Sequence, residues 1–107
     1  MENNIYEGTE KRSFFRIVYN PSKRPELKTN GISYKVIDIS QKGIRLLKSH
    51  ESGPAKRIQG NLKLLSGSNI NLKGTVVWEQ DNRFALFLED PLSPETLEKE
   101  RQYVILH

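Results

Sequence analysis

The chain of 107 residues contains no cysteine, which excludes disulfide bonds, thiolate metal sites and cysteine nucleophiles. It also has no apolar run near the roughly 20 residues that a transmembrane helix requires. The first residues, "MENNIYEGTEKR", are polar and lack the apolar stretch of a signal peptide. These absences together predict a protein of the reducing cytoplasm that is not inserted in a membrane.

Catalytic patterns are missing as well. His50 and His107 have no partner at the spacing of a metal site or a catalytic triad. The sequence has no glycine-rich phosphate loop, nucleophile elbow or zinc motif. We therefore expect a protein that is not an enzyme and that carries neither a metal nor a cofactor.

The composition is that of one globular domain covering residues 1–107. Hydrophobic residues make up 36% of the chain and charged residues 28%, which excludes a disordered chain. The net charge of +4 is a modest excess. It is compatible with an anionic partner such as a nucleic acid, a nucleotide or a lipid headgroup, but charge alone favours a domain that is merely basic.

Six segments have the β-branched and aromatic content or the alternation that is typical of strands. They are residues 14–19, 33–39, 44–48, 57–65, 69–79 and 83–88. Turn sequences separate them, and residues 20–31, which contain two prolines, are expected to form a loop or an irregular edge. Because helices do not alternate with these strands, the pattern predicts a mainly all-β antiparallel barrel or sandwich over residues 14–88.

The two ends of the chain differ from this pattern. Residues 1–13 are predicted to form a flexible arm. Residues 93–106 predict a short C-terminal helix, because Ser93 is a suitable N-cap and Pro94 suits the first helical position. We expect this helix to pack on the barrel.

Two short motifs remain as candidates for a function. Arg12 and Arg16 form an R-x-x-x-R pair, but seven arginines in 107 residues give roughly 0.4 such pairs by chance. The second motif, "DISQKG", combines Asp38, Ser40 and Gly43 at the end of a predicted strand and in the turn that follows. Its residue types give only roughly 0.02 chance matches, so it is the more specific of the two.

Together these motifs resemble the PilZ domain family, the bacterial receptors for cyclic di-GMP. That family joins an R-x-x-x-R arm to a six-stranded antiparallel β-barrel with D/N-x-S-x-x-G in an early hairpin, and "KRSFFR" and "DISQKG" match both parts in order. The segment "GTVVWEQDNRFALFL" is similar to the family's last two strands, so the resemblance covers nearly the whole chain. It implies that cyclic di-GMP binds to Arg12, Arg16, Asp38, Ser40 and Gly43.

The chemistry of these residue types suits that ligand. The planar fork of arginine can pair with phosphate oxygens or with guanine O6 and N7, and it can stack on a base. The Asp38 carboxylate can accept hydrogen bonds from the guanine N1–H and amino group. Ser40 can donate to a phosphate or satisfy the turn, and Gly43 is expected to provide a positive φ or a close approach of the backbone.

Two further residues are weaker candidates for ligand binding. Lys11 precedes the first arginine, at a position that the resemblance links to ligand stoichiometry, and a basic residue there favours an intercalated pair of ligands. Trp78 ends a predicted strand, where it either stacks on the ligand or fills the barrel core. Arg45, on the returning strand of the hairpin, either reaches the ligand or faces solvent.

The resemblance implies a stand-alone receptor whose arm changes conformation on binding and signals to an unidentified protein partner. Motility, adhesion and exopolysaccharide production are the processes that it suggests. One alternative is a small barrel that binds single-stranded nucleic acid through exposed Phe14, Tyr19 and Tyr34, although a nucleic-acid partner is less consistent with the motifs. Another is a PilZ-like module that contacts only proteins. Locally, Asp38 and Ser40 could instead satisfy backbone groups of their own turn.

Overall fold

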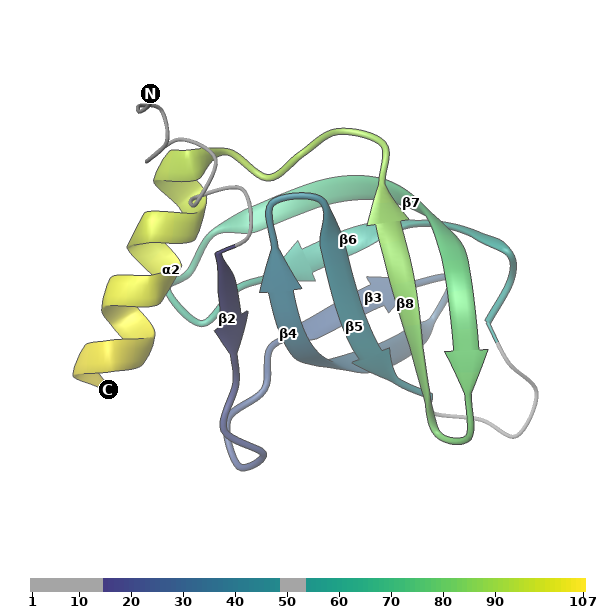
Figure 1. The fold of residues 1–107 in the computed structure, drawn as a ribbon, viewed down its shortest axis with the longest axis horizontal. Helices are drawn as coiled ribbons and strands as arrows, with labels where there is room; N and C mark the ends of the chain where they lie inside the picture. The colour runs from purple at the N-terminus through teal and green to yellow at the C-terminus, as the bar shows by residue number, and fades with distance from the viewer. Residues whose placement is uncertain (1–14, 49–53) are drawn as a thin grey trace, which may run out of the picture.

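The structure is a computed structural model, and it describes residues 15–48 and 54–107. In these residues the chain forms seven antiparallel strands and one helix (Figure 1). The elements are β2 (Arg16–Val18), β3 (Glu26–Thr29), β4 (Ile32–Ser40), β5 (Gly43–Leu47), β6 (Arg57–Lys63), β7 (Asn69–Gln80), β8 (Arg83–Leu88) and α2 (Pro94–Leu106). Within the described part of the chain, no helix is long and apolar enough to cross a membrane.

Six of the strands close into a barrel. Around it they follow the order β4, β3, β6, β7, β8 and β5, and the pairing of β5 with β4 closes the ring. The short strand β2 is an addition, paired with β4 beside the barrel. The predicted six-stranded antiparallel barrel with a C-terminal helix is therefore confirmed.

One strand of that barrel was not expected. The sequence predicts a loop or an irregular edge over residues 20–31, but Glu26–Thr29 forms strand β3 of the barrel wall. The segment 14–19, predicted as a barrel strand, contains the extra strand β2. Strand β3 has a single buried leucine, Leu27, in a polar sequence, so its apolar pattern is weak. The turn after it gives a clearer signal: Asn30 and Gly31 have φ of 51° and 79°, as an Asn-Gly hairpin turn requires.

The core fills the barrel with the side chains that the alternation predicted. Phe84, Leu86 and Leu88 of β8 are all buried, and they pack with residues of the other barrel strands. Tyr34 meets Phe84 edge to face, with ring centroids 5.0 Å apart. Such a pair adds about 0.5–1.5 kcal/mol beyond the burial of its apolar area.

Helix α2 begins as the sequence predicts. The Ser93 hydroxyl accepts a hydrogen bond from the Thr96 N–H at 3.1 Å, and Pro94 occupies the first turn. The helix lies beside β2, at the end of the barrel (Figure 1). Leu97 is buried in the core, whereas Ile105, near the end of the helix, is exposed.

A buried carboxylate holds α2 on the barrel. The Glu100 side chain has no exposed surface, and it accepts hydrogen bonds from Tyr19 Oη at 2.6 Å and from the Leu65 and Ser66 N–H groups at 3.1 and 3.0 Å. Tyr19 follows β2 directly, and the two backbone donors belong to the turn between β6 and β7. One side chain therefore joins the helix both to the residue after β2 and to the barrel turn between β6 and β7.

Candidate ligand-binding site

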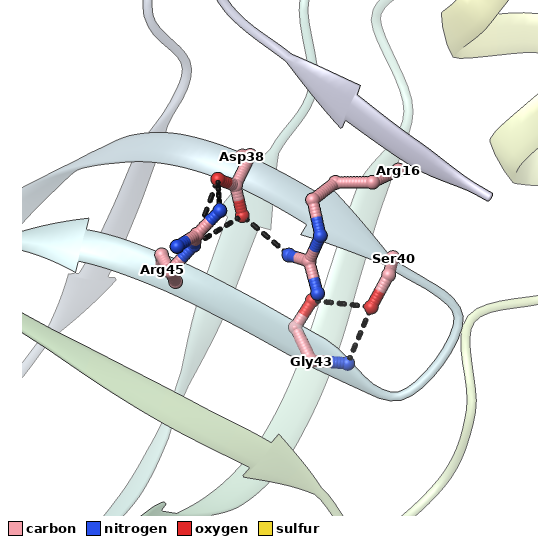
Figure 2. A network of polar contacts seen from close by, with 5 residues as sticks. All are labelled: Arg16, Asp38, Ser40, Gly43 and Arg45. Atoms are coloured by element: carbon pink, nitrogen blue, oxygen red, sulfur yellow. Dashed lines mark hydrogen bonds and ion pairs between the residues drawn. The ribbon is translucent and has the colours of Figure 1, made fainter. Parts of the chain in front are cut away.

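Asp38 is the centre of the candidate site. It lies on β4, and its side chain is only 1% exposed. Arg16 of β2 donates through Nη1 to Oδ1 at 2.6 Å, while Arg45 of β5 donates through Nε to both oxygens and places Nη2 2.7 Å from Oδ2. Figure 2 shows the two guanidinium groups reaching Asp38 from opposite sides. The arrangement is one buried anion between two cations.

A β-bulge places Asp38 on the outer wall of the barrel. The register pairs Val36 with Leu46 and then Asp38 with Arg45, so β4 has one extra residue at Ile37. The bulge reverses the alternation, and Val36 and Ile39 therefore both point into the core. Asp38 faces outward, opposite Arg45, where the two arginines cover it. Bulges often reorient side chains next to functional sites in this way.

Ser40 and Gly43 close the turn between β4 and β5. Ser40 Oγ accepts from the Gly43 N–H at 3.2 Å and donates to the Gly43 carbonyl at 3.3 Å (Figure 2). Gly43 does not have the positive φ that was one of two expectations for it, because Gly31 and Gly67 are the described glycines with that conformation. A Cβ on Gly43 would lie 3.4 Å from Ser40 Oγ and 3.6 Å from the Leu86 carbonyl oxygen, which are ordinary van der Waals distances. Ser40 therefore has the local structural role that the sequence left open for it.

A shallow pocket of about 310 Å³ adjoins this network. Arg16, Arg45 and Trp78 are among the residues that line it. The register connects them, because Arg45 pairs with Ala85 and Ala85 pairs with Trp78. Ala85 is small and almost buried, so it leaves a depression between the guanidinium group and the indole.

Trp78 lies outside the core. A second bulge shifts the register of β7 between Val76 and Trp78, and the Trp78 side chain is 38% exposed. The core alternative for this residue is wrong. Its neighbours Val77 and Phe87 are also exposed and line the same pocket.

Arg45 is the residue that the sequence did not assign. The pattern of Ile44, Arg45 and Leu46 indicates an outward side chain between two inward ones, but only the register of the hairpin shows that it faces Asp38. Arg12 and Lys11 lie outside the described residues. Of the two motifs, the structure therefore brings together Arg16, Asp38, Ser40 and Gly43.

The aromatic residues proposed for nucleic-acid binding do not form an exposed platform. Tyr19 and Tyr34 are 3% and 5% exposed, so the prediction that both are accessible is wrong. Both side chains belong to the core, and Phe14 lies outside the described residues. The described residues also hold no cluster of three metal-ligating side chains.

The geometry can be compared with known proteins. The model of the PilZ domain family matches residues 10–106. The chain belongs to the PilZ domain family. PilZ domains are binding and adaptor modules, and a module of that general kind agrees with an outer wall that carries paired cations beside a pocket.

Structural similarity supports the fold of this PilZ chain. The crystal structure of an uncharacterized protein from Legionella aligns with a TM-score of 0.60 and 17% sequence identity. The alignment covers 87% of this chain and 90% of the Legionella chain. No match was found among curated proteins. At this identity the likeness concerns the fold alone.

Proposed function

We propose that this PilZ domain is a receptor for cyclic di-GMP that acts in the bacterial cytoplasm and signals to a protein partner. The observation that carries the proposal is the buried Asp38 carboxylate between Arg16 and Arg45, beside a pocket bordered by Trp78. Cyclic di-GMP presents two phosphates and two guanines. A carboxylate, guanidinium forks and an indole are complementary to these groups.

Each side chain has a distinct part in this proposal. Arg16 binds a phosphate, together with Arg12 of the first motif. Asp38 accepts from the N1–H and amino group of one guanine, and Trp78 stacks on a base. Ser40 and Gly43 hold the turn beside the ligand. The volume of about 310 Å³ is at the lower limit of small-molecule pockets, so it holds part of the ligand, and the preceding arm covers the rest.

Titration with cyclic di-GMP tests the proposal. We expect saturable binding by calorimetry, accompanied by a change in the emission of Trp78, the single tryptophan of the chain. Arg12→Ala and Arg16→Ala should each weaken binding about 10- to 100-fold, because each removes a charge-assisted hydrogen bond. Asp38→Ala should weaken it to a similar extent.

Arg83→Ala is the matched control for this titration. Arg83 is an exposed arginine at the start of β8 and does not line the pocket, so its loss should leave binding within about threefold of the wild type. No heat and no change in emission with cyclic di-GMP would refute the receptor function. Binding of single-stranded DNA with a steep salt dependence would then favour a nucleic-acid partner, and its absence would favour a module that contacts only proteins.

The arm is proposed to carry the signal. Binding of Arg12 and Arg16 to one ligand would order residues 1–13 and create a new face for the partner, with motility, adhesion or exopolysaccharide production as the regulated process. We expect the amide NMR signals of these residues to lose their fast motion when cyclic di-GMP is added. Unchanged arm dynamics at saturation would contradict this step. If Lys11 favours an intercalated pair, calorimetry should give two ligands per site.

A further inference from the structure

The two arginines hold Asp38 in different ways. Arg45 donates through Nε to Oδ1 and Oδ2 at 3.1 and 2.9 Å, and its Nη2 lies 2.7 Å from Oδ2. Arg16 makes one contact, from Nη1 to Oδ1. Contacts to both oxygens determine where the carboxylate lies and how its plane is turned. Arg45 therefore sets the orientation of Asp38, and Arg16 adds a single bond at its side.

The strands that carry the arginines also differ. Strand β5 is paired on both sides, with β4 and with β8, and Arg45 lies directly opposite Asp38 in the register. Strand β2 has three residues and is paired with β4 alone. A strand with one partner is easier to displace than a strand in the barrel wall. Of the two cations, Arg16 is thus the one that a ligand can recruit.

We propose that Arg45 is a positioning residue that keeps the Asp38 carboxylate in place for guanine when Arg16 leaves it for the ligand. This inference rests on the proposed function. Asp38 is 1% exposed, and a buried carboxylate without a cation is strongly disfavoured as an anion. Guanine offers two donors, N1–H and the amino group, so it needs the ionised and correctly turned carboxylate. Arg45 supplies both conditions without touching the base.

Selectivity between bases distinguishes a residue that positions Asp38 from one that attracts phosphate or stabilises the fold. Cyclic di-IMP is the matched probe, because hypoxanthine lacks the amino group of guanine and is otherwise the same. The wild-type protein should bind cyclic di-GMP at least about tenfold more tightly than cyclic di-IMP, as loss of a hydrogen bond to a charged group predicts. In Arg45→Ala this ratio should fall to the value of Asp38→Ala, within about threefold of one. Arg45→Lys keeps the charge without the fork, so its ratio should be intermediate.

The double variant shows whether Arg45 acts through Asp38. In an Asp38→Ala background, Arg45→Ala should leave the selectivity ratio unchanged. Arg83→Ala, the exposed control, should keep the wild-type ratio. Thermal unfolding of each variant identifies those that fold, and Arg45→Lys carries the test if Arg45→Ala is too unstable to purify.

Three outcomes would overturn the inference. If Arg45→Ala weakens both dinucleotides equally, Arg45 attracts phosphate or stabilises the fold and does not position Asp38. If the wild-type protein binds cyclic di-GMP without preference over cyclic di-IMP, Asp38 does not read the amino group. If it binds neither dinucleotide, the proposed function fails as well, and this result is distinguishable from the first two.

Discussion

Removing both arginines from Asp38 should destabilise the protein more than removing Asp38 itself. The Arg16→Ala/Arg45→Ala variant leaves a carboxylate that is 1% exposed without either cation, which costs about 3–5 kcal/mol of unfolding free energy. For a domain whose whole stability is about 5–15 kcal/mol, this is a large fraction. Urea unfolding followed by circular dichroism measures the difference.

The smaller effect of Asp38→Ala follows from the exposure of its partners. The side chains of Arg16 and Arg45 are 40% and 39% exposed, so water continues to solvate both guanidinium groups when the carboxylate is gone. Because salt screens the repulsion between the two arginines, Asp38→Ala should lower the free energy of unfolding by only about 1–2 kcal/mol. The triple variant, which combines Asp38→Ala with the two arginine substitutions, should be more stable than Arg16→Ala/Arg45→Ala, because no buried charge remains without a partner.

The triple variant is the decisive comparison. If it is no more stable than Arg16→Ala/Arg45→Ala, the loss comes from the packing of the arginine stems and not from the stranded carboxylate. If Asp38→Ala is the least stable of the set, the side chain has a structural role beyond its ion pairs. Each variant would be measured at one ionic strength, since surface charge effects change with salt.

The barrel was largely predictable because its strands carry strong local patterns. The segments around Phe84 and Leu72 alternate between apolar and polar residues, and burial follows that alternation. Strand β3 lacked such a pattern, since Leu27 was its one strongly apolar residue. Its Asn30-Gly31 turn was the signal that could have identified it.

The candidate site was predictable in its residue types but not in its contacts. The family resemblance implied that Asp38 and Arg16 bind one ligand, yet the two β-bulges, at Ile37 and near Val77, have no signature in the sequence. Those bulges turn Asp38 and Trp78 onto the outer wall. Arg45 entered the site only through the register of the β4–β5 hairpin. Side-chain alternation predicts which face of a strand a residue occupies, whereas the register and the bulges determine which residues it contacts.

Glu100→Ala should be the other strongly destabilising substitution, with a loss of about 3 kcal/mol or more. It leaves the Tyr19 hydroxyl and the Leu65 and Ser66 N–H groups without their acceptor, and an unsatisfied buried donor costs about 1–3 kcal/mol. Lys99→Ala, at an exposed position of the same helix, is the control for helix propensity. Urea unfolding of the two variants measures the difference, and equal losses would contradict a special role for the buried carboxylate.

The hydrogen bond between Tyr19 and Glu100 also predicts how the stability of the protein depends on pH. Burial, followed by the hydrogen bond to Glu100 and its negative charge, raises the pKa of Tyr19 above its ordinary value of 10.0. Because the pKa of the folded state is higher than that of the unfolded state, this stability is complete below pH 10 and is lost as the pH rises above it. Burial also raises the pKa of Tyr34. The wild-type protein should therefore unfold in alkali as its tyrosines ionise.

Tyr19→Phe separates the contribution of the Tyr19 hydrogen bond to stability from the effect of ionising its hydroxyl. At pH 7 the variant should be less stable by about 1.5–3 kcal/mol, because it lacks the hydrogen bond that the Tyr19 hydroxyl donates to the Glu100 carboxylate. Above pH 10 the difference in unfolding free energy between the variant and the wild type should narrow. The wild type then loses the contributions of both Tyr19 and Tyr34, whereas the variant loses that of Tyr34 alone. Tyr103→Phe, at a partly exposed position of α2, is the control variant. A difference for Tyr19→Phe that stays constant above pH 10 would show that Tyr19 has the same pKa in the folded and the unfolded protein, and that the buried pair does not cause the alkaline transition.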